Sequence, residues 1–230
     1  ENNLINENYD VQRSLSSSED NVIFLEDYSY LISAYLSLYQ STFDNNYIDK
    51  ADKLTKKALI LFAHEESPFL IFSSDKSLFF SENLFVNQDG VMPSANSVMS
   101  KNLFLLSHYT GNRDYYDLGK SMIDAITNNT IENALDYMNW LNVSLDYNDE
   151  FFEVVISGKN SFEMAKEINS MYFPNILIAA SKKDSDRYLL KNRYIKGENL
   201  IYVCVNNTCK FPVNNVEEAL NLITQNDEKK

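Results

Sequence analysis

The chain has 230 residues, of which 44% are hydrophobic and 23% charged, a composition typical of a globular protein and not of a disordered one. Its 20 basic and 33 acidic side chains give a formal net charge of −13, which argues against nucleic acid or a membrane surface as a partner. No apolar run approaches the roughly 20 residues that cross a bilayer, and two cysteines exclude a disulfide-rich scaffold.

The first 20 residues are polar and lack a hydrophobic period, so we expect residues 1–20 to form a flexible arm. The chain begins at Glu1, and no apolar segment flanked by basic residues follows, so we predict no signal peptide. The chain is then either a processed product or a piece of a longer protein. We expect a cytoplasmic location.

Helical periodicity begins near Asn21 and predicts antiparallel helical pairs over residues 21–148. The short link Phe43–Asn46 joins the first two helices, and Asp44 or Asn45 is the candidate N-cap of the second. Residues 69–73 and 78–81 are rich in β-formers and predict a projecting hairpin. A third helix ends at Gly111, a fourth begins near Asp114, and a fifth is predicted over residues 131–145.

The period changes after residue 148. Apolar strands are predicted over residues 151–157, 176–180 and 200–205, with helices after the first and after Pro212. This alternation predicts a small α/β lobe with parallel pairing over residues 149–225, followed by a disordered tail, 226–230. The predicted fold is therefore mainly α: helical hairpins with an inserted β-hairpin, then a small α/β lobe.

Two segments carry candidate site residues. Glu26 and Asp27 are adjacent carboxylates at the start of the first helix, where they either perform acid–base chemistry or simply favour the positive end of the helix. The second segment runs from Asp89 to Ser97 and leads directly into the third helix. Its hydroxyl, amide and backbone N–H groups either bind a polar ligand or cap that helix.

Cys204 and Cys209 do not have the spacing of a thioredoxin-type redox pair, and no histidine stands near them in the sequence. A turn between them places the sulfurs close together, but we expect two reduced structural thiols. His64 and His108 lie near helix C-terminal ends without further ligands around them. We therefore expect no metal site and no cofactor.

Three segments together resemble one family. The helix LEDYSYLISAYLSLYQST is similar to a helix that contains LDDYA, and DGVMPSANS followed by a leucine-rich helix is similar to DGA-x-PSGNS. The closing stretch YVCVNNTCKFPV resembles YVC-x4-C-x-x-PV. These are motifs of the YyaL-like, or spermatogenesis-associated protein 20-like, family. The departures are Ala95 in place of the family's glycine and Glu26 in place of its first aspartate.

The resemblance implies an N-terminal thioredoxin-like domain and a six-hairpin (α/α)6 toroid, of which this chain would supply the C-terminal portion. Toroids of this shape occur in glycoside hydrolases and sugar epimerases. We therefore expect a pocket for a sugar-like or other polar small molecule, with Asp27 and Glu26 as catalytic residues. Further ligand-binding residues are expected to converge on the same pocket: Tyr28, Asp89, Ser94, Asn96 and Ser97.

The alternative is a non-catalytic scaffold or binding module that supports a thioredoxin-like domain in a redox or chaperone role. In either case, the missing part of the same chain is the expected partner. The open face of an incomplete toroid also predicts self-association.

Overall fold

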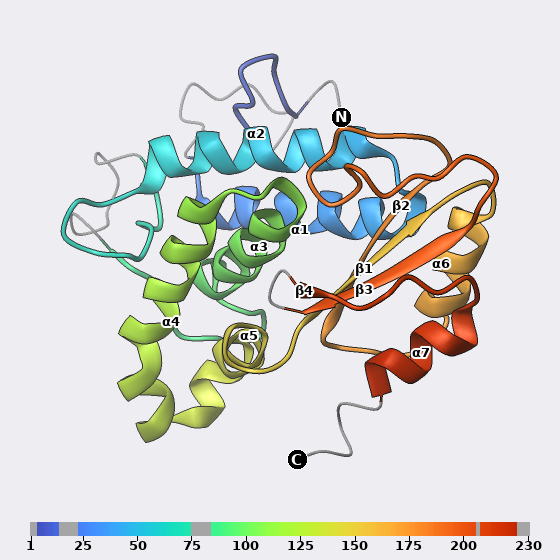
Figure 1. The fold of residues 1–230 in the computed structure, drawn as a ribbon. Coiled ribbons are helices and arrows are strands. Elements are labelled where there is room, and N and C mark those ends of the chain that lie inside the picture. The colour runs from blue at the N-terminus through green and yellow to red at the C-terminus, as the bar shows by residue number, and fades with distance from the viewer. Residues whose placement is uncertain (1–3, 14–22, 75–83, 206–207, 225–230) are drawn as a thin grey trace.

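The computed structural model describes residues 4–13, 23–74, 84–205 and 208–224 (Figure 1). Two helical hairpins and a further helix pack beside a small sheet with two helices of its own, so the predicted mainly α fold with an α/β lobe is confirmed. The helical part contains α1 (Leu25–Thr42), α2 (Asn45–Phe62), α3 (Ala95–Thr110), α4 (Arg113–Glu132), a 3-10 turn η1 (Ala134–Tyr137) and α5 (Met138–Asn148).

Helix ends follow the local signals. The Asp44 carboxylate accepts the N–H of Asn46 and begins α2, and Gly111 ends α3 in the left-handed conformation at φ 72°. The predicted single helix over 131–145 is wrong, because η1 interrupts it and α5 runs on to Asn148. The Asp89 backbone N–H donates to the Asp136 carbonyl at 2.7 Å, which fixes η1 from outside the segment.

The lobe contains β1 (Phe152–Ser157), α6 (Ser161–Asn169), β2 (Ile176–Ser181), β3 (Leu200–Val205), β4 (Thr208–Cys209) and α7 (Val216–Thr224). The strand order is β2-β1-β3-β4, with β1 and β2 parallel and β3 antiparallel to both β1 and β4. Only part of the predicted parallel pairing is therefore correct. The segment between β2 and β3 contains no crossover helix, and a parallel connection normally uses one.

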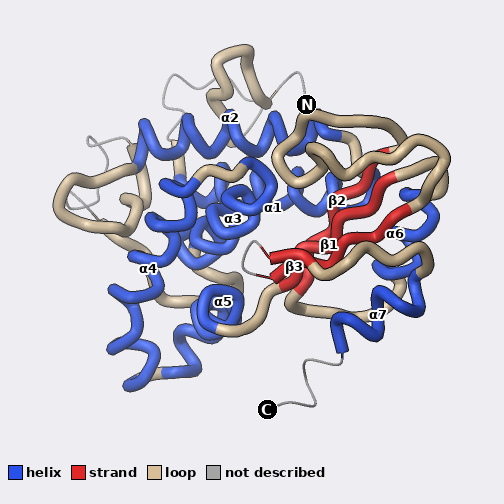
Figure 2. Tube along the Cα trace, viewed as in Figure 1, coloured by secondary structure: helices blue, strands red, loops and turns tan. Residues whose placement is uncertain are grey.

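Helices α6 and α7 cover one face of the sheet, and the helical hairpins lie against the other (Figure 2). One apolar cluster runs through both parts. Two contacts tie the lobe to the hairpins. The Tyr109 hydroxyl donates to the Ile178 carbonyl at 3.3 Å, and the two terminal guanidinium nitrogens of Arg187 pair with the Asp49 carboxylate. The expected boundary near residue 148 coincides with the change of elements, and its status as a domain boundary stays a prediction.

The structure describes part of the expected arm and part of the expected hairpin. Within the expected flexible arm 1–20, residues 4–13 form a small turn in which Ile5 and Val11 bridge, and this turn packs on α1. Residues 69–73 do not form a strand of a hairpin. Their backbone instead pairs with the start of α1, where the Leu25 N–H donates to the Phe72 carbonyl at 3.0 Å. The second half of that hairpin, 78–81, and the tail 226–230 lie outside the described residues.

Candidate functional site

A cavity of about 550 Å³ lies at the N-terminal end of α1 and holds both predicted catalytic carboxylates. Glu26 forms an ion pair with Arg13, and the Arg13 Nε lies 3.5 Å from Asp27 Oδ1. Tyr30 lines the same cavity, and its hydroxyl donates to the Pro93 carbonyl at 2.7 Å. Apolar side chains complete the walls: Leu4, Ile5, Val11, Leu31 and Met92.

The two carboxylates differ in their surroundings. Burial raises the pKa of Asp27, and the charge of Arg13 opposes that shift. The Asp27 side chain is 20% exposed, and that of Glu26 is 36% exposed. Asp27 therefore accepts a proton more readily than an ordinary aspartate, while Glu26 carries the ion pair with Arg13. Such an asymmetric carboxylate pair is suited to donating and accepting protons at hydroxyl groups.

Tyr28, predicted as a ligand-binding residue, does not line this cavity. Its side chain is fully buried. The hydroxyl accepts the Val11 N–H at 3.1 Å and donates to the Tyr9 carbonyl at 3.1 Å. Tyr28 therefore holds the 4–13 segment against α1, and this segment forms one wall of the cavity.

The Asp89–Ser97 segment uses its polar groups within the protein. Asp89 Oδ1 accepts the Ser94 N–H at 2.7 Å and the Ser97 hydroxyl at 3.1 Å. Its Oδ2 accepts the Asn139 N–H at 2.8 Å. The Ser94 hydroxyl caps α3 by accepting the Ser97 N–H at 3.3 Å. One aspartate thus joins the starts of α3 and α5.

Asn96 makes a two-point contact with one backbone residue. Its Oδ1 accepts the Leu70 N–H at 2.9 Å, and its Nδ2 donates to the Leu70 carbonyl at 2.9 Å. Both residues are 1% exposed. Asp89, Ser94, Asn96 and Ser97 thus use these polar groups within the protein, where they position the loops beside the cavity. Their predicted ligand-binding role stays a prediction.

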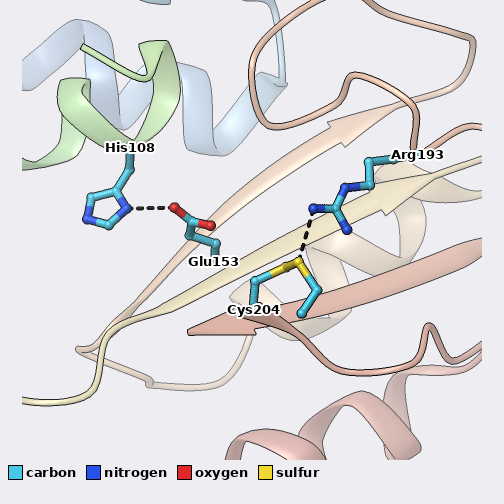
Figure 3. Close-up of a disulfide and its surroundings, with 5 residues drawn as sticks. His108, Glu153, Arg193 and Cys204 are labelled. Carbon is cyan, nitrogen blue, oxygen red and sulfur yellow. Dashed lines mark hydrogen bonds and ion pairs between the residues drawn. A yellow bond between two sulfur atoms is a disulfide. The ribbon is translucent and has the colours of Figure 1, made fainter. Parts of the chain in front are cut away.

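A second polar cluster lies where α3 meets the sheet, and the sequence reasoning missed it. His108 Nδ1 lies 2.7 Å from Glu153 Oε1 on the central strand β1 (Figure 3). His108 Nε2 is buried and has no hydrogen-bond partner among the described residues. A cavity of about 310 Å³ borders this pair, with Tyr116 and Tyr188 among its walls. A glutamate inside the apolar run FFEVVIS was the available signal.

Cys204 and Cys209 form a disulfide in the structure, which corrects the prediction of reduced structural thiols. The two residues lie directly opposite each other in the β3–β4 hairpin, and this register brings their side chains to the same face. Sequence spacing alone does not define such a register.

The described residues provide neither a metal-binding cluster nor a membrane-spanning helix. No group of three or more His, Cys, Asp or Glu side chains in that part of the chain is arranged to hold a metal ion. None of the helices described here is both long enough and apolar enough to span a membrane.

The chain is thus a helical-hairpin protein with an α/β lobe, and a cavity lined by two carboxylates lies at the start of α1. No protein-family model matches the chain. The chain is 23% identical over 212 residues to spermatogenesis-associated protein 20 of Homo sapiens, covering 87% of this chain and 27% of that protein. The Mus musculus protein of the same name is 22% identical over 214 residues, covering 88% and 27%.

An uncharacterized protein of Caenorhabditis elegans is also similar, at 23% identity over 210 residues, covering 88% of this chain and 28% of that protein. The chain thus spans little more than a quarter of the length of these relatives. The similarity to spermatogenesis-associated protein 20 confirms the family resemblance that the motifs indicated.

Proposed function

We propose that the cavity at the start of α1 binds a carbohydrate or another polyhydroxylated small molecule, with Asp27 and Glu26 contacting its hydroxyl groups. The observation that carries this proposal is the placement of both carboxylates, Arg13 and Tyr30 in one cavity with apolar walls. Sites for small polar molecules combine apolar and aromatic walls with a few convergent polar groups.

Asp27 is the proton donor and acceptor of the pair. Because burial raises its pKa, protonation is less costly there than at an exposed aspartate, and this favours acid–base work near neutral pH. Glu26 forms an ion pair with Arg13, and carboxylate oxygens of this kind accept hydrogen bonds from hydroxyl groups. The resemblance to sugar-binding toroids supports the same ligand class.

The proposal is tested by ligand binding to the purified chain. Isothermal titration with glucose, mannose, N-acetylglucosamine and xylitol should detect at least one ligand, and Asp27→Asn should weaken its binding at least tenfold. Asp52→Asn is the matched control, because Asp52 is a carboxylate on α2 that pairs with Lys56 away from the cavity. Equal binding by both variants would refute the assignment of Asp27.

The alternative scaffold role predicts a different outcome. A scaffold binds none of these molecules, and Asp27→Asn then changes neither binding nor turnover. A full-length relative carrying the corresponding substitution should lose ligand binding or turnover if the cavity is a site, and should keep its activity if the helical part is only a support.

A further inference from the structure

Three residues with reactive or ionisable side chains stand in one row across the sheet. Glu153 on β1 is the register partner of Cys204 on β3, and Cys204 is the register partner of Cys209 on β4. Directly opposed residues of antiparallel strands point to the same face of a sheet. The carboxylate and the disulfide therefore share one face of the sheet, the face on which His108 of α3 contacts Glu153 (Figure 3).

The two sulfurs differ in accessibility. Cys204 is 1% exposed, whereas Cys209 is only partly buried and belongs to a two-residue edge strand. Thiol–disulfide exchange requires an incoming thiolate to reach one sulfur of the bond. Cys209 is therefore the sulfur that an outside thiol attacks, and Cys204 is the inner leaving group.

The positively charged side chain of Arg193 contacts the accessible sulfur, Cys209 Sγ. The Arg193 Nη2 donates to Cys209 Sγ at 3.0 Å (Figure 3). The guanidinium also stacks on the Tyr202 ring at 4.7 Å, and the Arg193 carbonyl accepts the Ser157 hydroxyl at 2.6 Å. Within the described part of the chain, Arg193 forms no ion pair with a carboxylate. A fixed positive charge beside a sulfur favours its thiolate form.

We propose that Cys204–Cys209 is a redox-active disulfide that undergoes reversible exchange with thiols, with Cys209 as the exchanging cysteine and Cys204 as the resolving cysteine. The reductant is a thiol such as glutathione. Its thiolate attacks Cys209 Sγ, the intramolecular S–S bond breaks, and the electron pair leaves on Cys204, which takes up a proton. A second thiolate then attacks the sulfur of the first reductant molecule and releases Cys209 as a thiolate beside Arg193.

Two reductant thiols are thereby oxidised to one disulfide, and the protein disulfide is reduced to two thiols. The His108–Glu153 pair is the proton donor and acceptor available to Cys204, one strand away on the same face. Among the described residues, the charged and titratable groups on this side of the disulfide include Glu153 from β1, His108 from α3 and Arg193 from the β2–β3 segment. Lys210 is next to Cys209 in the chain. The Lys210 ammonium donates to the Leu222 carbonyl at 3.1 Å.

A purely structural disulfide would behave differently, and glutathione redox buffers separate the two cases. The folded chain is equilibrated at several ratios of reduced to oxidised glutathione, quenched in acid, tagged with a maleimide and analysed by mass spectrometry. We expect reversible conversion within the range of these buffers, with unchanged circular dichroism. A disulfide that stays intact in excess dithiothreitol until the protein unfolds would overturn the proposal.

Variants test the roles of single residues. In the reduced protein, iodoacetamide should alkylate Cys209 at least tenfold faster than Cys204 at pH 7. Arg193→Gln should move the pH profile of that alkylation upward and slow it several-fold at pH 7. Lys120→Gln, at a lysine on α4 that pairs with Asp124, should leave the profile in place. An unchanged profile in Arg193→Gln would contradict the activating role of Arg193.

Two further variants address the inner cysteine. Cys204→Ser should leave Cys209 able to trap one glutathione per chain as a mixed disulfide, whereas Cys209→Ser should trap little because Cys204 is buried. Equal trapping by the two variants would refute the assignment of Cys209 as the exchanging cysteine. Glu153→Gln should slow reduction of the disulfide and leave the alkylation profile of Cys209 in place.

Discussion

Replacing Asn96 with alanine tests whether this residue holds the fold or binds a ligand. The side chain satisfies both backbone polar groups of Leu70, each at 2.9 Å, at a position that is 1% exposed. Alanine removes two hydrogen bonds and leaves a buried N–H and a buried carbonyl without a partner. Each buried group left unpaired costs about 1–3 kcal/mol, so we expect the free energy of unfolding to fall by about 2–6 kcal/mol.

For a protein of this length, 1 kcal/mol corresponds to roughly 2–4 °C in melting temperature. Asn96→Ala should therefore lower the midpoint by about 4–24 °C in a thermal melt and reduce the urea midpoint in parallel. Asn169→Ala is the control: its Nδ2 donates to the Gln40 carbonyl at 2.9 Å at an exposed site, where substitutions stay within about 0.5 kcal/mol. If the two variants melt alike and Asn96→Ala loses only ligand binding, the positioning role is wrong.

Three other outcomes are expected. Gly111→Ala places a Cβ 2.6 Å from the Tyr188 ring at φ +72°, whereas Gly197→Ala, at φ +90°, meets nothing within 4 Å. Chemical denaturation should show a larger loss of unfolding free energy for Gly111→Ala. Equal losses in the two variants would exclude the Tyr188 contact as the cause. The Arg187 guanidinium lowers the pKa of Asp49, so the stability contributed by this ion pair is complete above about pH 4 and is lost as pH falls further. Asp49→Asn should therefore flatten the acid limb of a stability–pH curve, and an unchanged limb would count against the ion pair. Burial raises the pKa of Asp27, so the free energy of unfolding falls as pH rises through that pKa. In the same stability–pH curve, Asp27→Asn should match or exceed the native protein at pH 7, and this advantage should vanish below about pH 4.

Local sequence signals predicted the helix ends that depend on neighbouring residues. Asp44 and Gly111 act within one turn of their own helices, so their effect is readable without tertiary information. The break between α4 and α5 is different, because the Asp89 segment fixes η1 and the start of α5 from some 50 residues away. The direction of β3 could not be predicted either, since an apolar strand has the same sequence pattern whether it runs parallel or antiparallel to its neighbour.

Some residues of the candidate sites could likewise be predicted from local sequence, whereas others depend on tertiary structure. Glu26 and Asp27 were found because adjacent carboxylates at a helix start are visible in sequence, and they do line a cavity. The Asp89–Ser97 loop was read as ligand-binding, since Asp, Ser and Asn at a helix start look alike whether they serve a ligand or their own backbone. The row Glu153, Cys204 and Cys209 was missed because it exists only through strand register.

Helix α3 separates the two proposed sites. Its N-terminal end is fixed by Asp89 and Asn96 beside the α1 cavity, and its last turn carries His108 to the sheet. Sixteen residues of helix span about 24 Å at roughly 1.5 Å per residue. Sites farther apart than about 10 Å with no shared partners normally respond additively to substitution. A double variant of Asp27 and Arg193 should therefore show the sum of the single effects, so failure of one proposal leaves the other standing. A large interaction between them would mean that α3 moves as a unit and couples ligand binding to the redox state of the disulfide.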